Sequence, residues 1–140
     1  MYVVEKRDAL LLGRVIDEAR KTAEILTGVI RQIYPKTNME FSIQQIENNL
    51  LCYANIFLSK GLDSVVIDLD IWNAIKDIDN YVVQLGELYE RYRWRLYRYH
   101  KDYAQIVDSI IEMLEDNMKW CLSRLLILDE IYGMRNKTGN

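Results

Sequence analysis

Hydrophobic residues recur every three or four positions along most of this chain, which is the spacing of amphipathic α-helices. The first row predicts a helix over residues 5–34, which Pro35 is expected to end because proline lacks a backbone N–H donor. This row consists of Leu12, Val15, Ala19, Thr22, Leu26, Val29 and Ile33. One face of the first helix is therefore expected to lie in a hydrophobic core.

Two local signals bracket a second helix. Ser42 and Gln45 have the spacing of a capping box at its start, and Gly61 is placed to end it in a left-handed conformation. The apolar row between them consists of Ile43, Ile46, Leu50, Tyr53 and Phe57. We expect residues 62–70 to form a connector or the start of another helix. Residues 65–67 favour a β-strand, but a single strand would lack a partner in this chain.

A nearly heptad row starts at Ile71 and continues to the region of Tyr132, which is too long for one helix of an ordinary globular domain. We expect a break around residues 98–102, with Asp102 and Gln105 as a second capping pair. Before the break the row consists of Ile71, Ile75, Ile78, Val82, Leu85, Leu88 or Tyr89, Tyr92, Leu96 and Tyr99. After the break it consists of Ile106, Ile110, Met113, Cys121 and Leu125.

Together these segments predict an all-α fold, most simply an antiparallel bundle of four to five helices. We expect residues 1–140 to form a single helical domain, with the polar residues 134–140 as a frayed tail. Long helices rich in isoleucine and leucine also favour a homodimer or a larger homo-oligomer.

The composition narrows the class of protein without naming a function. Half of the 140 residues are hydrophobic, yet no window is apolar enough to span a membrane and the charged start does not resemble a secretory signal. Cys52 and Cys121 are too few for a disulfide framework and predict buried thiols in a reducing cytoplasm. With one histidine and no Cys/His cluster, the sequence predicts no metal site and no cofactor. A net charge of −3 argues against nucleic-acid binding over the whole surface but permits a local patch.

Residues 89–103 are such a patch. They hold five Lys or Arg residues against two acidic ones, five of the ten tyrosines, one of the three tryptophans and the single histidine. Basic residues interleaved with aromatic ones suit single-stranded nucleic acid, because arginine binds phosphate and aromatic rings stack on unpaired bases. The RNA-binding candidates are Arg91, Arg93, Arg98, Lys101 and Tyr97.

The helical register of this segment leaves a second interpretation open. One face carries Arg91, Arg95 and Arg98, and another carries Tyr92, Leu96, Tyr99 and Tyr103. The tyrosine face continues the core row and is expected to pack at the edge of the core. The arginine face is either a polyanion site or a solvated face that pairs with acidic residues elsewhere in the bundle.

His100 follows Arg95 with the spacing Arg-x4-His, and it follows Arg93 with the spacing Arg-x6-His. This pattern resembles the signature of the HEPN superfamily of small all-helical proteins, in which the motif lies at the approach to the last long helix. An acidic amphipathic segment, residues 106–116, follows here in the same way and is similar to that of the HepT-like toxins.

The resemblance implies metal-independent RNA cleavage in a cleft between two protomers. His100 would act as general acid and base, and Arg95 would stabilise the negative charge that develops on phosphorus. A dimer would supply two copies of each residue. The family also implies a nucleotidyltransferase-type antitoxin as a partner.

Two other classes of function remain open. The chain can be a non-enzymatic helical module, such as an RNA- or protein-binding subunit of a larger complex, of which the small subunits of CRISPR effector complexes are an example. It can also be a structural protein, for instance of a virus particle, in which residues 89–103 form an assembly surface.

Overall fold

The computed structural model describes residues 2–3, 5–37, 43–60, 66–67 and 69–133. In chain order these form β1 (Tyr2–Val3), α1 (Lys6–Thr37), α2 (Ile43–Lys60), β2 (Val66–Ile67), α3 (Leu69–Tyr99) and α4 (Lys101–Tyr132). The predicted all-α class is confirmed, and the predicted helix boundaries agree with these within a few residues.

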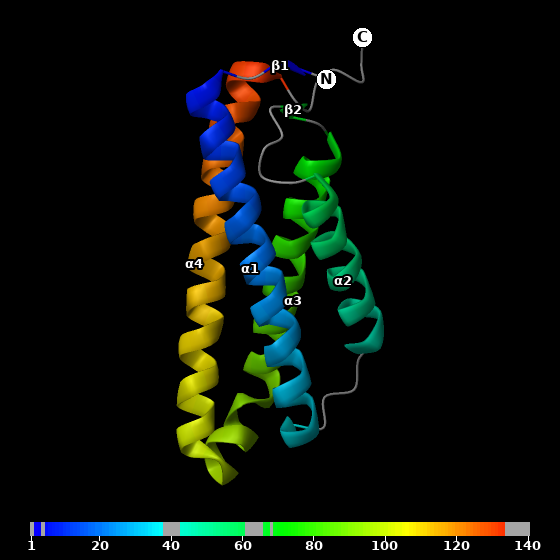
Figure 1. Ribbon diagram of the computed structural model, residues 1–140. Coiled ribbons are helices and arrows are strands. Elements are labelled where there is room, and N and C mark those ends of the chain that lie inside the picture. Colours follow the sequence, from blue (N-terminus) through cyan, green and yellow to red (C-terminus); the bar gives the residue numbers. More distant parts are fainter. Residues whose placement is uncertain (1, 4, 38–42, 61–65, 68, 134–140) are drawn as a thin grey trace.

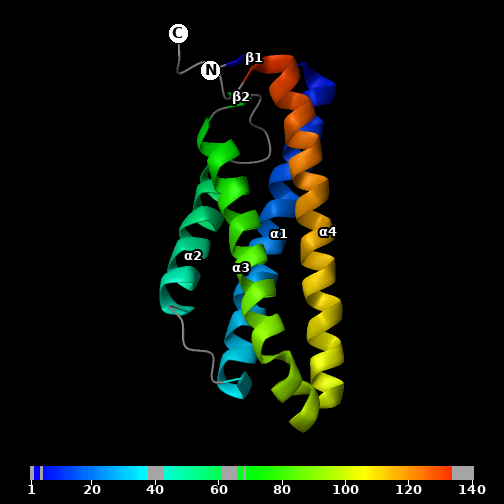
Figure 2. The ribbon, with the colours of Figure 1, turned by 180° about the vertical axis from the view of Figure 1, so that it is seen from behind.

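The four helices form an up-and-down bundle in which α1 and α3 run one way and α2 and α4 run the other (Figure 1). Helix α1 contacts each of the other three helices, and α3 and α4 form the most extensive contact. Helix α2 is shorter than the rest and lies against α1 and α3, as the view from behind also shows (Figure 2). This is the predicted antiparallel arrangement.

The core row of α1 matches the prediction in full, because every residue from Leu12 to Ile33 in that row is buried. The row of α3 is buried as far as Leu96 at most of its positions. A fully buried leucine or isoleucine side chain stabilises the fold by roughly 1.5–3 kcal/mol. On α2, Leu50 is buried and Tyr53 is half-buried, whereas the side chains of Ile43, Ile46 and Phe57 lie outside the described part.

The core row predicted for α4 is wrong in its first half. Ile106 is 57% exposed and Met113 is 40% exposed, while the buried residues are Ala104, Val107, Ile111, Leu114, Met118, Cys121, Leu125 and Leu128. Helix α4 carries two interleaved apolar rows, and the predicted row started on one and ended on the other. The row that faces α1 and α3 is the one that became buried.

The expectation that residues 65–67 would lack a partner strand is also wrong. Val66–Ile67 pairs antiparallel with Tyr2–Val3, so that Tyr2 lies opposite Ile67. The partner comes from the residues before the first helix, which the hydrophobic pattern left unassigned. The pair connects the start of the chain to the segment that leads into α3.

The helix ends differ in how well the local signals predicted them. Helix α1 continues through Pro35 to Thr37, so the proline lies in its last turn and the helix ends later than expected. Helix α4 ends as expected, with Gly133 in a left-handed conformation (φ 63°) and its N–H donating to the Asp129 carbonyl. The proposed caps Ser42 and Gly61 lie outside the described residues, although α2 starts and ends beside them.

Polar contacts connect helices at the surface of the bundle. Tyr53 Oη donates to Asp77 Oδ2 at 2.7 Å and so links α2 to α3. Tyr132 Oη donates to Asp8 Oδ2 at 2.5 Å and ties the end of α4 to the start of α1. These contacts align helices whose packing comes from the apolar rows.

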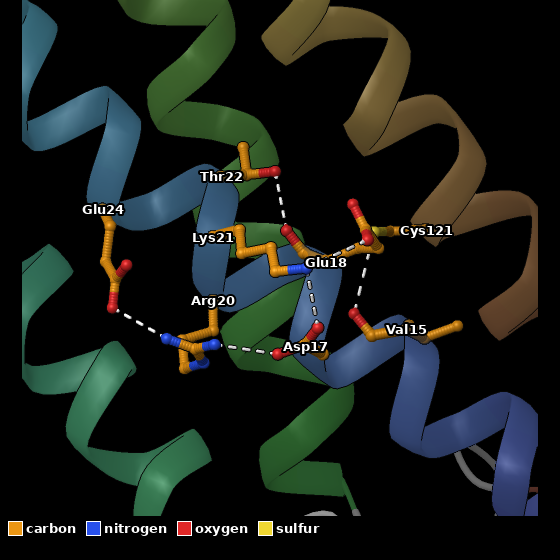
Figure 3. Close-up of polar contacts among 8 residues, drawn as sticks. All are labelled: Val15, Asp17, Glu18, Arg20, Lys21, Thr22, Glu24 and Cys121. Atoms are coloured by element: carbon orange, nitrogen blue, oxygen red, sulfur yellow. Dashed lines mark hydrogen bonds and ion pairs between the residues drawn. The ribbon is translucent and has the colours of Figure 1, made fainter.

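The solvent side of α1 carries ion pairs within the helix (Figure 3). Arg20 bridges Asp17 at 2.8 Å and Glu24 at 2.9 Å, with spacings of three and four residues that place these groups on one face. Deeper in the same region, the thiol of Cys121 on α4 lies 3.8 Å from the Val15 carbonyl (Figure 3). Cys121 is buried as predicted, but Cys52 is exposed, contrary to the prediction.

Candidate functional site

The predicted break between the last two helices occurs at a single residue, His100. Its backbone angles (φ −145°, ψ 57°) are not helical, although its N–H still donates to the Leu96 carbonyl at 2.7 Å. The His100 carbonyl accepts from Ala104 N–H at 2.9 Å and so begins α4. His100 is therefore the N-cap residue, and the predicted capping role of Asp102 is wrong. Asp102 lies in the first turn, where a negative charge interacts favourably with the helix dipole.

Four of the predicted basic or catalytic side chains are exposed around this break: Arg91, Arg98, His100 and Lys101. Arg95 is half-buried. They come from the last three turns of α3 and the first turn of α4, at the end of the bundle where these two helices meet (Figure 1). We call these five residues, together with Trp94 and Tyr99, the basic end.

Two aromatic rings of the basic end face solvent. Trp94 is 60% exposed, and the Arg95 guanidinium lies 5.5 Å from the centre of its ring. Tyr99 is 64% exposed, with the Arg98 guanidinium at the same distance from its ring. Tyr99 was expected to pack at the core edge, but α3 ends there and the ring extends past the packed part of the bundle. In each pair the guanidinium lies within the distance of a cation–π interaction with the exposed ring.

Arg93 and Tyr97 are placed differently from the other candidates, because Asp108 on α4 binds both of them. Arg93 Nε lies 3.2 Å from Asp108 Oδ1, and its Nη2 lies 2.9 Å from Oδ2. Tyr97 Oη donates to the same Oδ2, and the Arg93 guanidinium lies 4.7 Å from the Tyr97 ring centre. The sequence analysis predicted acidic partners only for the face of Arg91, Arg95 and Arg98, and it did not point to Asp108 as a partner of Arg93.

The titration of this cluster follows from its contacts. Burial acts to raise the pKa of Asp108, but the hydrogen bonds from Arg93 and Tyr97 outweigh burial and lower that pKa below its usual value. Conversely, the hydrogen bond to Asp108 raises the pKa of Arg93 and of Tyr97. Arg93 and Tyr97 therefore serve first to join α3 to α4, next to the break at His100.

An acidic groove between α3 and α4 borders this cluster. It has a volume of about 670 Å³, and its charged lining residues are Glu87, Glu90, Arg93, Asp108, Glu112 and Glu115. Five carboxylates against one guanidinium repel a polyanion. The positive charge of the basic end therefore does not continue along this groove.

Sequence reasoning missed Trp94 as a site residue. The signal was present, because Trp94 shares a helical face with Arg91 and Arg98, and a large aromatic residue on an arginine face has no core to enter. Among the described residues, no group of three or more histidine, cysteine or acidic side chains is arranged to hold a metal ion. Within the same residues, no helix has the length and apolar character needed to cross a membrane.

Comparisons of the chain with protein-family models, with curated proteins and with solved structures give no match.

Proposed function

We propose that this protein binds single-stranded RNA at the basic end of the bundle. The observation that carries the proposal is the pair of solvent-exposed rings, Trp94 and Tyr99, each with a guanidinium beside it. A stacked base gains from both an aromatic ring and an arginine plane, and unpaired bases offer such faces whereas those of a duplex are buried.

The start of α4 adds a contact for phosphate. The first N–H groups of a helix have no partner within the helix, and the His100 side chain does not cap them. A phosphate near this turn would meet those N–H groups together with Arg98 and Lys101. The proposal places the protein in the cytoplasm, in keeping with its two free thiols, Cys52 and Cys121.

RNA cleavage by Arg95 and His100 is a second candidate function. It is supported by the exposure of His100 at the break, since a general acid and base must reach the ribose hydroxyl. Its HEPN-like form requires the basic ends of two copies to meet and would bring a nucleotidyltransferase-type antitoxin as partner. RNA binding requires neither condition, and for that reason we place it first.

The test of binding is fluorescence anisotropy with labelled single-stranded RNA at several salt concentrations. We expect R91Q/R98Q to weaken binding about tenfold or more and to reduce the salt slope, because each lost phosphate contact removes about 0.7 from the slope for a single strand. The matched control K6Q/R7Q removes two exposed positive charges at the opposite end of the bundle and should bind as the wild type does. Equal losses in both variants, or no binding by the wild type, would refute the site.

The same samples test cleavage. Labelled RNA is incubated in EDTA with the wild type and with His100→Ala, and binding is recorded in parallel. Cleavage that disappears in His100→Ala while binding persists establishes the second candidate. Binding without cleavage by either protein leaves an RNA-binding module.

A further inference from the structure

The outward side of α4 carries a second, mostly apolar row that lies outside the buried core row of this helix. Its members are Ile106, Ile110, Met113, Asn117, Trp120, Arg124, Ile127 and Ile131. They alternate at spacings of four and three residues along the helix, which is the repeat of a helix that packs along its length against another helix. We call this the outer row.

The outer row is exposed at four of its eight positions and half-buried at the other four, Ile110, Asn117, Trp120 and Arg124. Ile106 and Ile131 at its two ends are each 57% exposed, and Met113 and Ile127 are 40% and 45% exposed. Ile106, Ile110 and Met113 line a shallow hollow of about 550 Å³. Apolar side chains that follow one another along one helix are a contact surface, in contrast to isolated exposed residues.

From this row we infer that the protein forms a two-fold homodimer in which α4 of one copy packs antiparallel against α4 of a second copy. The row is self-complementary when it is reversed. In the register that overlaps it fully, Ile106 lies opposite Ile131 of the second copy and Ile110 lies opposite Ile127. Asn117 then lies opposite Trp120 beside the two-fold axis.

The charged residues beside the outer row favour antiparallel packing of the two α4 helices. In a parallel pair, Arg124 would lie beside Arg124 of the second copy, which is unfavourable. In the antiparallel pair, Arg124 lies opposite Met113 of the second copy and within one helical turn of its Asp116. The same reversal brings Glu112 near Arg124 of the second copy.

The outer row alone is too small for a stable dimer, so the proposed contact includes α1. The outer row spans 26 residues, or about 39 Å at 1.5 Å per residue, and with a helix width of about 10 Å it supplies about 400 Å² per copy. Stable dimers bury about 800 Å² per copy. Helix α1 borders the row, because the Arg14 guanidinium lies 5.4 Å from the Trp120 ring centre. On the face of Arg14, α1 offers Leu10, which is 65% exposed, and the half-buried Ile25.

This dimer also has a consequence for the basic ends. Helix α4 has 32 residues and is about 48 Å long, so two antiparallel copies place their His100 residues near opposite ends of the contact. The assembly would present two separate RNA-binding ends and would not form a shared cleft. The inference itself does not depend on RNA binding.

The first test is the mass of the full chain in solution, by light scattering or analytical ultracentrifugation over a range of concentrations. We expect a dimer for the wild type and for Leu51→Lys, which places a charge at a 50% exposed residue on α2. I106K/I127K should dissociate, with about a tenfold or greater loss of affinity for each buried charge, while its helical circular dichroism is unchanged. A monomeric wild type, or a dimer that I106K/I127K leaves intact, would overturn the proposal.

Disulfide trapping tests the direction. In a Cys52→Ser background, Ile106→Cys and Ile131→Cys are prepared as separate proteins and then mixed under oxidising conditions. The antiparallel pair predicts cross-linked dimers in the mixture and few in either protein alone. Efficient cross-linking of Ile106→Cys with itself would show a parallel pair and would overturn the assignment of direction.

Discussion

Arg93 on α3 binds Asp108 on α4 through two nitrogen atoms, with Nη2 at 2.9 Å and Nε at 3.2 Å from the two carboxylate oxygens. This pair joins the two helices about two turns from the break at His100. A guanidinium that meets a carboxylate in this forked geometry fixes the orientation of both side chains. The pair therefore holds the helices that carry the basic end in a defined register.

Replacing Asp108 with alanine should lower the free energy of unfolding by about 1–3 kcal/mol at neutral pH, because Arg93 and Tyr97 lose a charged hydrogen-bond partner. The folded pKa of Asp108 is lowered, so its contribution is complete above the pKa of an unfolded aspartate, about 3.9, and is lost as the pH falls through the folded value. In urea unfolding, the difference in the free energy of unfolding between the wild type and Asp108→Ala should be constant from neutral pH to about pH 5. Below about pH 4 this difference should become smaller.

The control for this experiment is Glu112→Ala, which removes an exposed carboxylate one turn further along α4. We expect a change within about 0.5 kcal/mol, as is usual for a surface substitution. If Asp108→Ala lowers the free energy of unfolding no more than the control does, the ion pair contributes nothing measurable to stability.

Two glycines should respond to alanine in opposite directions. Gly133 has φ 63° and ends α4, so an added Cβ is strained there even though no atom lies within 4 Å of it, and Gly133→Ala should destabilise by about 1 kcal/mol. Gly28 is exposed within α1 and also has room for a Cβ. Gly28→Ala should stabilise by about 0.5–1 kcal/mol, because alanine loses less conformational entropy in a helix. Thermal unfolding of both variants tests this prediction. If the two melting temperatures shift in the same direction, the prediction is wrong.

The fold could be predicted from the sequence because its determinants are local and repetitive. The apolar row from Leu12 to Ile33 lies on one face of α1, so only one orientation of this helix buries the whole row. Helix α4 has two apolar faces, and spacing alone does not say which one enters the core. The pairing of Val66–Ile67 with Tyr2–Val3 joins segments far apart in the chain, and no local pattern predicts such a contact.

The candidate site was predictable in position but not in detail. Clustered charge located the basic end, and the helical register of Arg91 and Arg98 placed them on one face, where the structure shows both exposed. Register could not show that Arg93 would meet Asp108, because that contact depends on how α4 folds back from the break at His100. The exposure of Trp94 and Tyr99 likewise depends on where the packed part of the bundle ends.

The two cysteines should differ sharply toward thiol reagents. Burial raises the pKa of Cys121 to about 12 and also shields its sulfur, whereas Cys52 is exposed. Only the thiolate reacts, so Ellman's reagent should titrate one thiol at once and the second only as the protein unfolds. Cys52→Ser should remove the fast phase and leave the slow one. Two fast thiols in the wild type would contradict the burial of Cys121.

The last prediction separates stacking from charge at the basic end. Trp94→Ala should weaken binding of single-stranded RNA by about 1–3 kcal/mol, the usual loss for one stacked base, with little change in the salt slope. Arg98→Gln should instead lower that slope by about 0.7, because one phosphate contact and its released counterion are lost. Trp94→Phe keeps an aromatic ring and should recover most of the affinity lost in Trp94→Ala. Salt titrations of the three variants measure both quantities, and a changed slope in Trp94→Ala with full affinity in Arg98→Gln would show that RNA does not bind through these paired groups.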